Sequence, residues 1–253
     1  MREPHLPPAY RLITLDMVDS TNAEARRLAI LGEEKSPDGT LIWAKEQTAG
    51  RGRRGRKWQS PRGNLYCSLI LRPEVPAEQA AQLSFVGALA ACDALSAISP
   101  PGHIVQIKWP NDILLNGEKV GGLLLEAETG GGKTPDWVIM GLGVNVAQYP
   151  SNVEFPATSL KASGWTVTEV DCLEAFSRHF MTWANTWLDQ GFGAIRKHWL
   201  WRCKGIGDKI EVRLANKTMK GVFKDIDQDG ALLLKSGKRE LRITAGDVFF
   251  TTA

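Results

Sequence analysis

The sequence has little of what marks a secreted or zinc-bound protein. Only four cysteines occur among 253 residues, far apart, with no Cys-x-x-Cys pair and no Cys/His ligand spacing. Disulfide frameworks and closed zinc sites depend on such spacing, so we expect reduced thiols in the core. The cysteines are Cys67, Cys92, Cys172 and Cys203.

Targeting and membrane signals are also scarce. The first ten residues contain three prolines and no apolar run, so no signal peptide is recognisable. The longest apolar stretch, 83–98, is interrupted by Ser84 and Asp93 and falls short of a membrane span. We therefore expect a soluble, cytoplasmic protein without a membrane partner.

A nucleophile for covalent catalysis is missing as well. The four histidines are scattered, and none pairs with a serine or cysteine in a recognisable hydrolase context. A serine or cysteine nucleophile mechanism therefore has no support in the sequence.

The positive charge is concentrated in one place. The chain has 31 basic and 28 acidic residues, but five of the basic residues fall between 51 and 57 with no acid among them. Without them the balance would be −2. The basicity therefore belongs to a local site, which argues against a protein that wraps nucleic acid. The five residues are Arg51, Arg53, Arg54, Arg56 and Lys57.

Apolar runs and turn signals predict an α+β fold with a mixed sheet packed against helices. Ser20 is the expected N-cap of the first helix, and Asn116-Gly117 is the sequence favoured for a type I′ hairpin. Strands are expected at 12–15, 40–44, 65–71, 105–109, 112–115, 119–128 and 137–146, and helices at 22–31, 78–98, 170–188 and 194–201.

The character of the chain changes after Gly205-Ile-Gly207. Four short strands separated by turn residues are expected at 210–214, 219–225, 231–234 and 239–244. This spacing predicts a small antiparallel barrel. We therefore divide the chain into a domain of residues 1–204 and a smaller one of residues 205–253.

The basic residues lie in the segment Gly50-Arg-Gly-Arg-Arg-Gly55-Arg-Lys-Trp58. It has the G-x-G-x-x-G spacing of a dinucleotide fingerprint, but no helix can open there before the strand at 65. A glycine-rich loop with five cations suits a polyphosphate, because arginine offers forked donors to phosphate oxygens. A solvated basic loop or a nucleic-acid contact remains the alternative.

Lys108 stands near the end of an apolar strand, in Lys108-Trp-Pro-Asn-Asp112. A lysine buried there needs an anionic partner. A ligand carboxylate or phosphate is one candidate, and a structural ion pair with Asp112 is the other. Gly141 and Gly143 within a strand indicate a bulge or a close approach of ligand or backbone.

Six segments, taken in order, closely resemble the biotin protein ligase family, over the chain from about Leu12 to its end. They are Asp19-Ser-Thr-Asn22, Glu46-Gln47-Thr48, Gly50 to Trp58, Lys108 to Asp112, Val120-Gly-Gly122 and Gly141-Leu-Gly-Val-Asn145. The resemblance implies a fold like that of class II aminoacyl-tRNA synthetases and biotin ligases, followed by a small SH3-like barrel.

The resemblance also implies an activity. Members of the family join biotin to ATP as biotinyl-5′-adenylate, with Mg²⁺, and then transfer biotin to one lysine of a biotin carboxyl carrier protein. Both nucleophiles come from substrates, which explains why the protein shows none. The protein then has to neutralise phosphate charge, align the reactants and exclude water.

Site residues follow from the same resemblance. Lys108 should bridge the biotin carboxylate and the α-phosphate, Arg53 should act with it in catalysis, and Asp112 should orient Asn111 or help hold Mg²⁺. Contacts to ATP or the adenylate are implied for Arg51, Arg54, Arg56, Trp58, Asn111 and Asn145. Biotin contacts are implied for Ser20, Thr21, Asn22, Gln47, Arg51, Gly52, Arg53, Lys108, Gly141 and Gly143.

Fewer than 20 residues precede Asp19, which is too few for the DNA-binding module of bifunctional family members. We therefore expect a stand-alone ligase that does not bind DNA, as a monomer or a homodimer. Two alternatives remain: a ligase for a related acid such as lipoate, and a single-stranded nucleic-acid binder. The second should interleave aromatic residues with its basic run, yet only Trp58 is near it.

Overall fold

The computed structural model describes residues 2–214 and 216–250. A seven-stranded sheet with the order β1-β2-β3-β7-β6-β5-β4 forms its centre. β1 and β2 pair in parallel and all other neighbours are antiparallel. The strands are β1 (Arg11–Leu15), β2 (Thr40–Ala44), β3 (Leu65–Leu71), β4 (Val105–Lys108), β5 (Asp112–Leu115), β6 (Glu118–Glu128) and β7 (Trp137–Val144).

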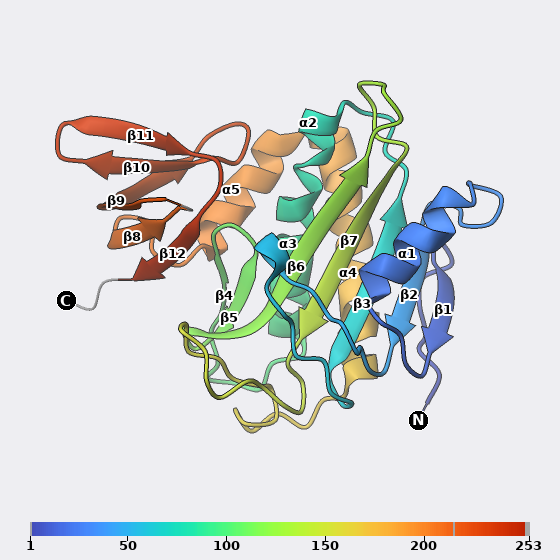
Figure 1. The fold of residues 1–253 in the computed structure, drawn as a ribbon. Helices are drawn as coiled ribbons and strands as arrows, with labels where there is room; N and C mark the ends of the chain where they lie inside the picture. The colour runs from blue at the N-terminus through green and yellow to red at the C-terminus, as the bar shows by residue number, and fades with distance from the viewer. Residues whose placement is uncertain (1, 215, 251–253) are drawn as a thin grey trace.

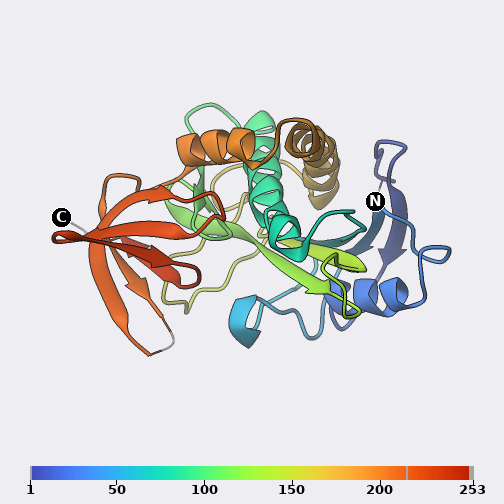
Figure 2. The ribbon, with the colours of Figure 1, turned by 90° about the horizontal axis from the view of Figure 1, so that it is seen from above.

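Helices cover the two faces of this sheet unequally (Figures 1 and 2). α1 (Thr21–Ile30) lies alone on one face, and the other face carries α3 (Leu83–Ala97), α4 (Glu169–Gln190) and α5 (Phe192–Arg202). α2 (Ala77–Ala80) precedes α3, so the helix expected at 78–98 is interrupted. Ser20 caps α1 as predicted, its hydroxyl accepting from the Ala23 amide.

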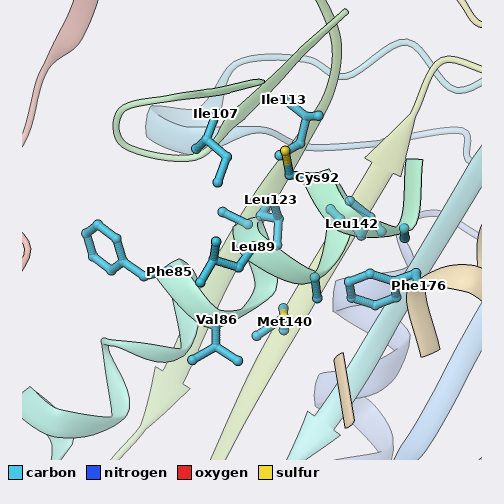
Figure 3. Close-up of a cluster of buried hydrophobic side chains, with 14 of the residues drawn as sticks. Phe85, Val86, Leu89, Cys92, Ile107, Ile113, Leu123, Met140, Leu142 and Phe176 are labelled. Carbon is cyan, nitrogen blue, oxygen red and sulfur yellow. The ribbon is translucent and has the colours of Figure 1, made fainter. Parts of the chain in front are cut away.

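α3 supplies the centre of the main core. It is apolar on every side, and Figure 3 shows its Phe85, Val86, Leu89 and Cys92 among side chains of β4 to β7 and α4. By length and composition 77–97 could cross a membrane, but two thirds of its most apolar window is buried in the protein. It is therefore explained as a core helix. All four cysteines are buried and free, and burial raises the pKa of each thiol.

The C-terminal segment forms a five-stranded antiparallel sheet with the order β11-β10-β9-β8-β12. It packs on the rest of the chain: the Trp109 indole donates to the Gly230 carbonyl at 3.0 Å, and both parts share one hydrophobic core. The strands are β8 (Lys209–Arg213), β9 (Thr218–Ile226), β10 (Leu232–Ser236), β11 (Arg239–Ile243) and β12 (Asp247–Phe250). β12 is not among the strands predicted from the sequence.

Candidate active site

A cavity of about 350 Å³ opens on the α1 side of the large sheet. Its walls come from the start of α1, the loop 50–58, the ends of β4 and β5, the middle of β6 and β7, and β12. Fifteen of the predicted site residues line it: Ser20, Thr21, Asn22, Gln47, Arg51, Gly52, Arg53, Arg56, Trp58, Lys108, Asn111, Asp112, Gly141, Gly143 and Asn145.

Two glycines of β7 make room for the cavity. Alternate residues of a strand share one face, and the face that carries Trp137 and Ile139 under α1 continues with Gly141 and Gly143. A Cβ on Gly141 would lie 2.2 Å from the Asn22 amide oxygen, and one on Gly143 would lie 2.7 Å from the Trp58 indole nitrogen. A larger residue at either position would therefore displace the Asn22 or the Trp58 side chain.

Polar side chains at the start of α1 form one connected network. Gln47 accepts through Oε1 from the Thr21 amide at 2.8 Å and from the Thr21 hydroxyl at 3.1 Å. The buried Ser68 hydroxyl lies 2.8 Å from the Thr21 hydroxyl and 2.6 Å from Asn22 Oδ1. Asn22 Nδ2 donates to Glu126 at 2.7 Å. Buried polar groups are thus satisfied while one side of the network borders the cavity.

The arginine loop folds back on itself beside the cavity. The Gly52 amide donates to the Arg56 carbonyl at 2.7 Å, and the Trp58 amide donates to the Gly50 carbonyl at 2.9 Å. A short 3₁₀ turn, η1 (Arg53–Gly55), forms its tip, where Arg54 has a positive φ of 56°. Arg53 is half-buried and donates to the Asn111 side-chain oxygen at 3.3 Å.

Lys108 lies at the end of β4, where its side chain is 6% exposed. Its ammonium lies 2.9 Å from Asp112 Oδ2 and 3.7 Å above the centre of the Phe155 ring. Lys119 holds the other oxygen of Asp112 at 2.5 Å. Both partners predicted for Lys108 are thus compatible with the structure: Asp112 pairs with it, and the ammonium still borders the cavity.

The charges of this cluster are strongly coupled. Burial lowers the pKa of Lys108, and Asp112 opposes that shift. Burial alone would raise the pKa of Asp112, but Lys119 and Lys108 outweigh it and hold that pKa at about 2. Two ammonium groups and one carboxylate leave a net charge of +1 beside the cavity.

Two predicted roles fit the geometry poorly. Arg54 does not line the cavity and instead pairs with Asp247 of β12 at 3.4 Å. Asp112 is not arranged as a Mg²⁺ ligand, since lysines hold both of its oxygens. In the described part of the chain, no group of three His, Cys, Asp or Glu side chains could hold a metal ion.

Five further residues complete the site, and the sequence analysis missed all of them: Ser68, Lys119, Glu126, Phe155 and Asp247. A charged Glu126 within an apolar strand was a usable signal. Asp247 is separated from its partner Arg56 by 191 positions, so no local pattern could connect them.

Sequence comparisons identify the family of the chain. The model of the "Biotin/lipoate A/B protein ligase family" matches residues 55–201, and that of the "Biotin protein ligase C terminal domain" matches 205–251. A biotin–[acetyl-CoA-carboxylase] ligase from Paracoccus denitrificans is 40% identical over 242 residues, which cover 93% of this chain and 99% of the relative. The chain belongs to the biotin protein ligase family.

This chain covers different shares of other family members. The bifunctional ligase/repressor BirA of Bacillus subtilis (strain 168) is 36% identical, over 94% of this chain and 73% of the relative. The structure of the Aquifex aeolicus biotin protein ligase in complex with biotin and ATP has a TM-score of 0.79 at 27% identity, covering 96% of this chain and 99% of that one. The predictions of family, fold class and enzyme class are confirmed, with the C-terminal sheet as the SH3-like domain.

Proposed function

We propose that this ligase forms biotinyl-5′-adenylate from biotin and ATP in the cavity and then biotinylates a carrier-protein lysine. The cluster of Lys108, Asp112 and Lys119, in which Lys108 is buried, is the observation that carries the proposal, because its net charge of +1 calls for an anion. The cavity joins this cluster to the polar network of α1 on one side and to the arginine loop on the other.

The polar network suits the head group of biotin. A cyclic urea has two N–H donors and one carbonyl acceptor, and Ser20, Thr21, Asn22 and Gln47 supply hydroxyl and amide groups of both kinds. Gly141 and Gly143 leave space beneath the ring system. We therefore place the head group between the start of α1 and the floor of β7.

Lys108 is then placed to act on the reacting carboxylate. One carboxylate oxygen attacks the α-phosphorus of ATP, and the bond to the β-phosphate oxygen breaks with its electron pair leaving on pyrophosphate. The ammonium of Lys108 reduces repulsion between the two anions and stabilises charge that grows on the α-phosphate oxygens. Asp112 positions that ammonium rather than acting as a base, because a carboxylate with a pKa of about 2 is a weak proton acceptor.

The second half-reaction needs no nucleophile from the protein either. The neutral amine of the carrier lysine attacks the acyl carbon, and AMP leaves with the electrons of the mixed-anhydride bond. The amine nitrogen releases one proton to solvent as the amide forms. Arg51, Gly52 and Arg53 cover the ligand and keep water from the anhydride. Arg56, Trp58, Asn111 and Asn145 line the remaining wall, where we place the nucleotide.

We propose that Mg²⁺ arrives bound to the phosphates of ATP, since both oxygens of Asp112 are paired with lysines.

The acceptor is a biotin-carrier protein, and we propose a biotin carboxyl carrier protein. We propose no DNA role for the arginine loop, since it borders the cavity and pairs with β12. A reducing cytoplasm suits the free thiols. We propose a domain boundary after residue 204, which lies between the family matches at 55–201 and 205–251.

Biotin-dependent exchange between ATP and pyrophosphate, followed by labelling of a purified carrier domain, tests the proposal. We expect exchange with biotin, and label on one lysine of the carrier. Exchange with lipoate alone would contradict the assigned substrate. Salt-sensitive binding to an oligonucleotide without any exchange would contradict the enzyme assignment.

A further inference from the structure

Glu126 connects to the head-group network from β6, four residues beyond the motif Val120-Gly-Gly122 and outside it. It lies on β6 opposite Ile139, on the face that also carries Gly122 and Leu124 of the cavity wall. From there one carboxylate oxygen accepts from Asn22 Nδ2 at 2.7 Å, and the other lies 3.8 Å from the Arg51 guanidinium. Asn22 itself is 4% exposed, so its partners decide how its amide is turned.

Both ends of this network are fixed hydrogen-bond acceptors. A backbone N–H can only donate, so the Thr21 amide fixes Gln47 Oε1 as an acceptor. At the other end a carboxylate can only accept, so Glu126 fixes Asn22 Nδ2 as the donor and turns Oδ1 toward Ser68. The hydroxyl groups of Thr21 and Ser68 lie between these ends and can rotate to donate or to accept, whereas Gln47 Oε1 and the Glu126 carboxylate can only accept.

After these contacts the Asn22 side chain can still form two more hydrogen bonds. A side-chain amide has two N–H donors and an oxygen with two lone pairs. Glu126 takes one N–H and Ser68 takes one lone pair, which leaves one donor and one acceptor for a ligand in the cavity. With the amide rotated by 180° the same positions would present the opposite pattern.

We propose that Glu126 is a positioning residue that sets the Asn22 amide in the one orientation that matches the cyclic urea of biotin. The inference rests on the proposed function and adds a specificity determinant outside the family motifs. Glu126 acts through Asn22 and does not touch the reacting atoms.

The isosteric change Glu126→Gln tests this directly. Glutamine can donate as well as accept, so it no longer fixes the Asn22 amide, and the charge-assisted bond is lost. We expect the KM for biotin to rise roughly 5- to 10-fold, with kcat and the KM for ATP little changed. Glu128→Gln is the matched control, because Glu128 follows on the same face of β6 but is exposed and pairs with Arg26.

A double-mutant cycle identifies the route of the effect. In an Asn22→Ala background, Glu126→Gln should change the KM for biotin less than twofold, because the residue it positions is absent. An undiminished effect there would mean that Glu126 acts through Arg51, and it would overturn the proposal. An unchanged KM in the single variant would overturn it too, whereas a wild-type enzyme without biotin-dependent exchange would instead refute the proposed function.

Discussion

Replacing Gly141 by alanine adds one methyl group to the floor of the cavity, directly under the head-group network. The new Cβ would lie 2.2 Å from Asn22 Oδ1 and 3.0 Å from its Cγ, about 1.2 Å short of the distance at which ordinary contact with Oδ1 begins. The backbone on β7 pairs on both sides and cannot retreat easily. The Asn22 side chain therefore has to move.

The size of the effect follows from the bonds that this movement breaks. A shift of about 1 Å takes Asn22 out of hydrogen-bond reach of Glu126 and Ser68, which it now contacts at 2.7 and 2.6 Å. Without these partners the amide no longer presents its remaining donor and acceptor to the head group. The loss of two hydrogen bonds to the ligand corresponds to about 2–3 kcal/mol, or roughly 30- to 150-fold in the KM for biotin. Overpacking adds about 1–3 kcal/mol of lost stability, a Tm decrease of several degrees.

Initial rates of biotin-dependent ATP–pyrophosphate exchange over a biotin titration measure the effect, with thermal unfolding recorded on the same preparation. The KM for ATP should change little. Gly122→Ala is the matched control: Gly122 pairs with Gly143 across the sheet, and a Cβ there would meet Lys119 and Asp112 at 3.5 Å or more. A Gly141→Ala enzyme with an unchanged KM for biotin would refute the placement of the head group on β7.

Three further outcomes are expected. Lys108→Ala should reduce adenylate formation at least a hundredfold, because removal of a single preorganised charge contact costs about 2.7–4 kcal/mol. Circular dichroism should show an intact fold. Near-normal exchange would exclude the role assigned to Lys108. Asp112→Asn removes the carboxylate that raises the pKa of Lys108, so the alkaline limb of the pH–rate profile for exchange should move to lower pH; an unmoved limb would show that Lys108 does not control it. Arg53→Gly should let the adenylate escape from the site. The escape would be measured as biotin attached to bystander proteins. Biotin found only on the carrier would contradict closure of the site by the loop.

Asp112 also makes the stability of the protein depend on pH, at the acid end of the range. Asp112 has a pKa of about 2 in the folded protein against an ordinary value of 3.8. Its ion pairs therefore contribute stability that is complete above pH 4, and this contribution is lost as the pH falls from about 4 toward 2. In Asp112→Asn this part of the acid transition should be absent, which acid titration of the unfolding midpoint would detect.

Local signals in the sequence were sufficient for much of the fold. Ser20 begins α1 because its hydroxyl satisfies a free backbone amide, and that preference depends on neighbouring residues only. The hairpin at Asn116 and Gly117 formed because both residues tolerate positive φ, here 52° and 90°. The exposed, cationic character of the loop 50–58 likewise follows from its composition.

Lys119 shows where a local pattern fails. Strict alternation on β6 would place Lys119 on the face opposite to Gly122. The register between β5 and β6 shifts after Ile113, so that Lys119 pairs with Leu114 and returns to the face of Asp112. A bulge of this kind depends on how two strands settle against each other, and the sequence of one strand does not reveal it.

The loop arginines illustrate what only the assembled fold can decide. In composition they are equivalent cations, but the fold gives them different partners: Asp247 for Arg56, Glu126 for Arg51, and a neutral amide oxygen of Asn111 for Arg53. A carboxylate that is paired with an arginine compensates part of the charge that the arginine can offer to a phosphate. Of these three, Arg53 is also the half-buried one, where a charge interacts more strongly. From the sequence the loop is simply basic, but partners from β6 and β12 make its arginines different from one another. Arg53 is the one of these three that pairs with no carboxylate, so its charge is the most available to a phosphate.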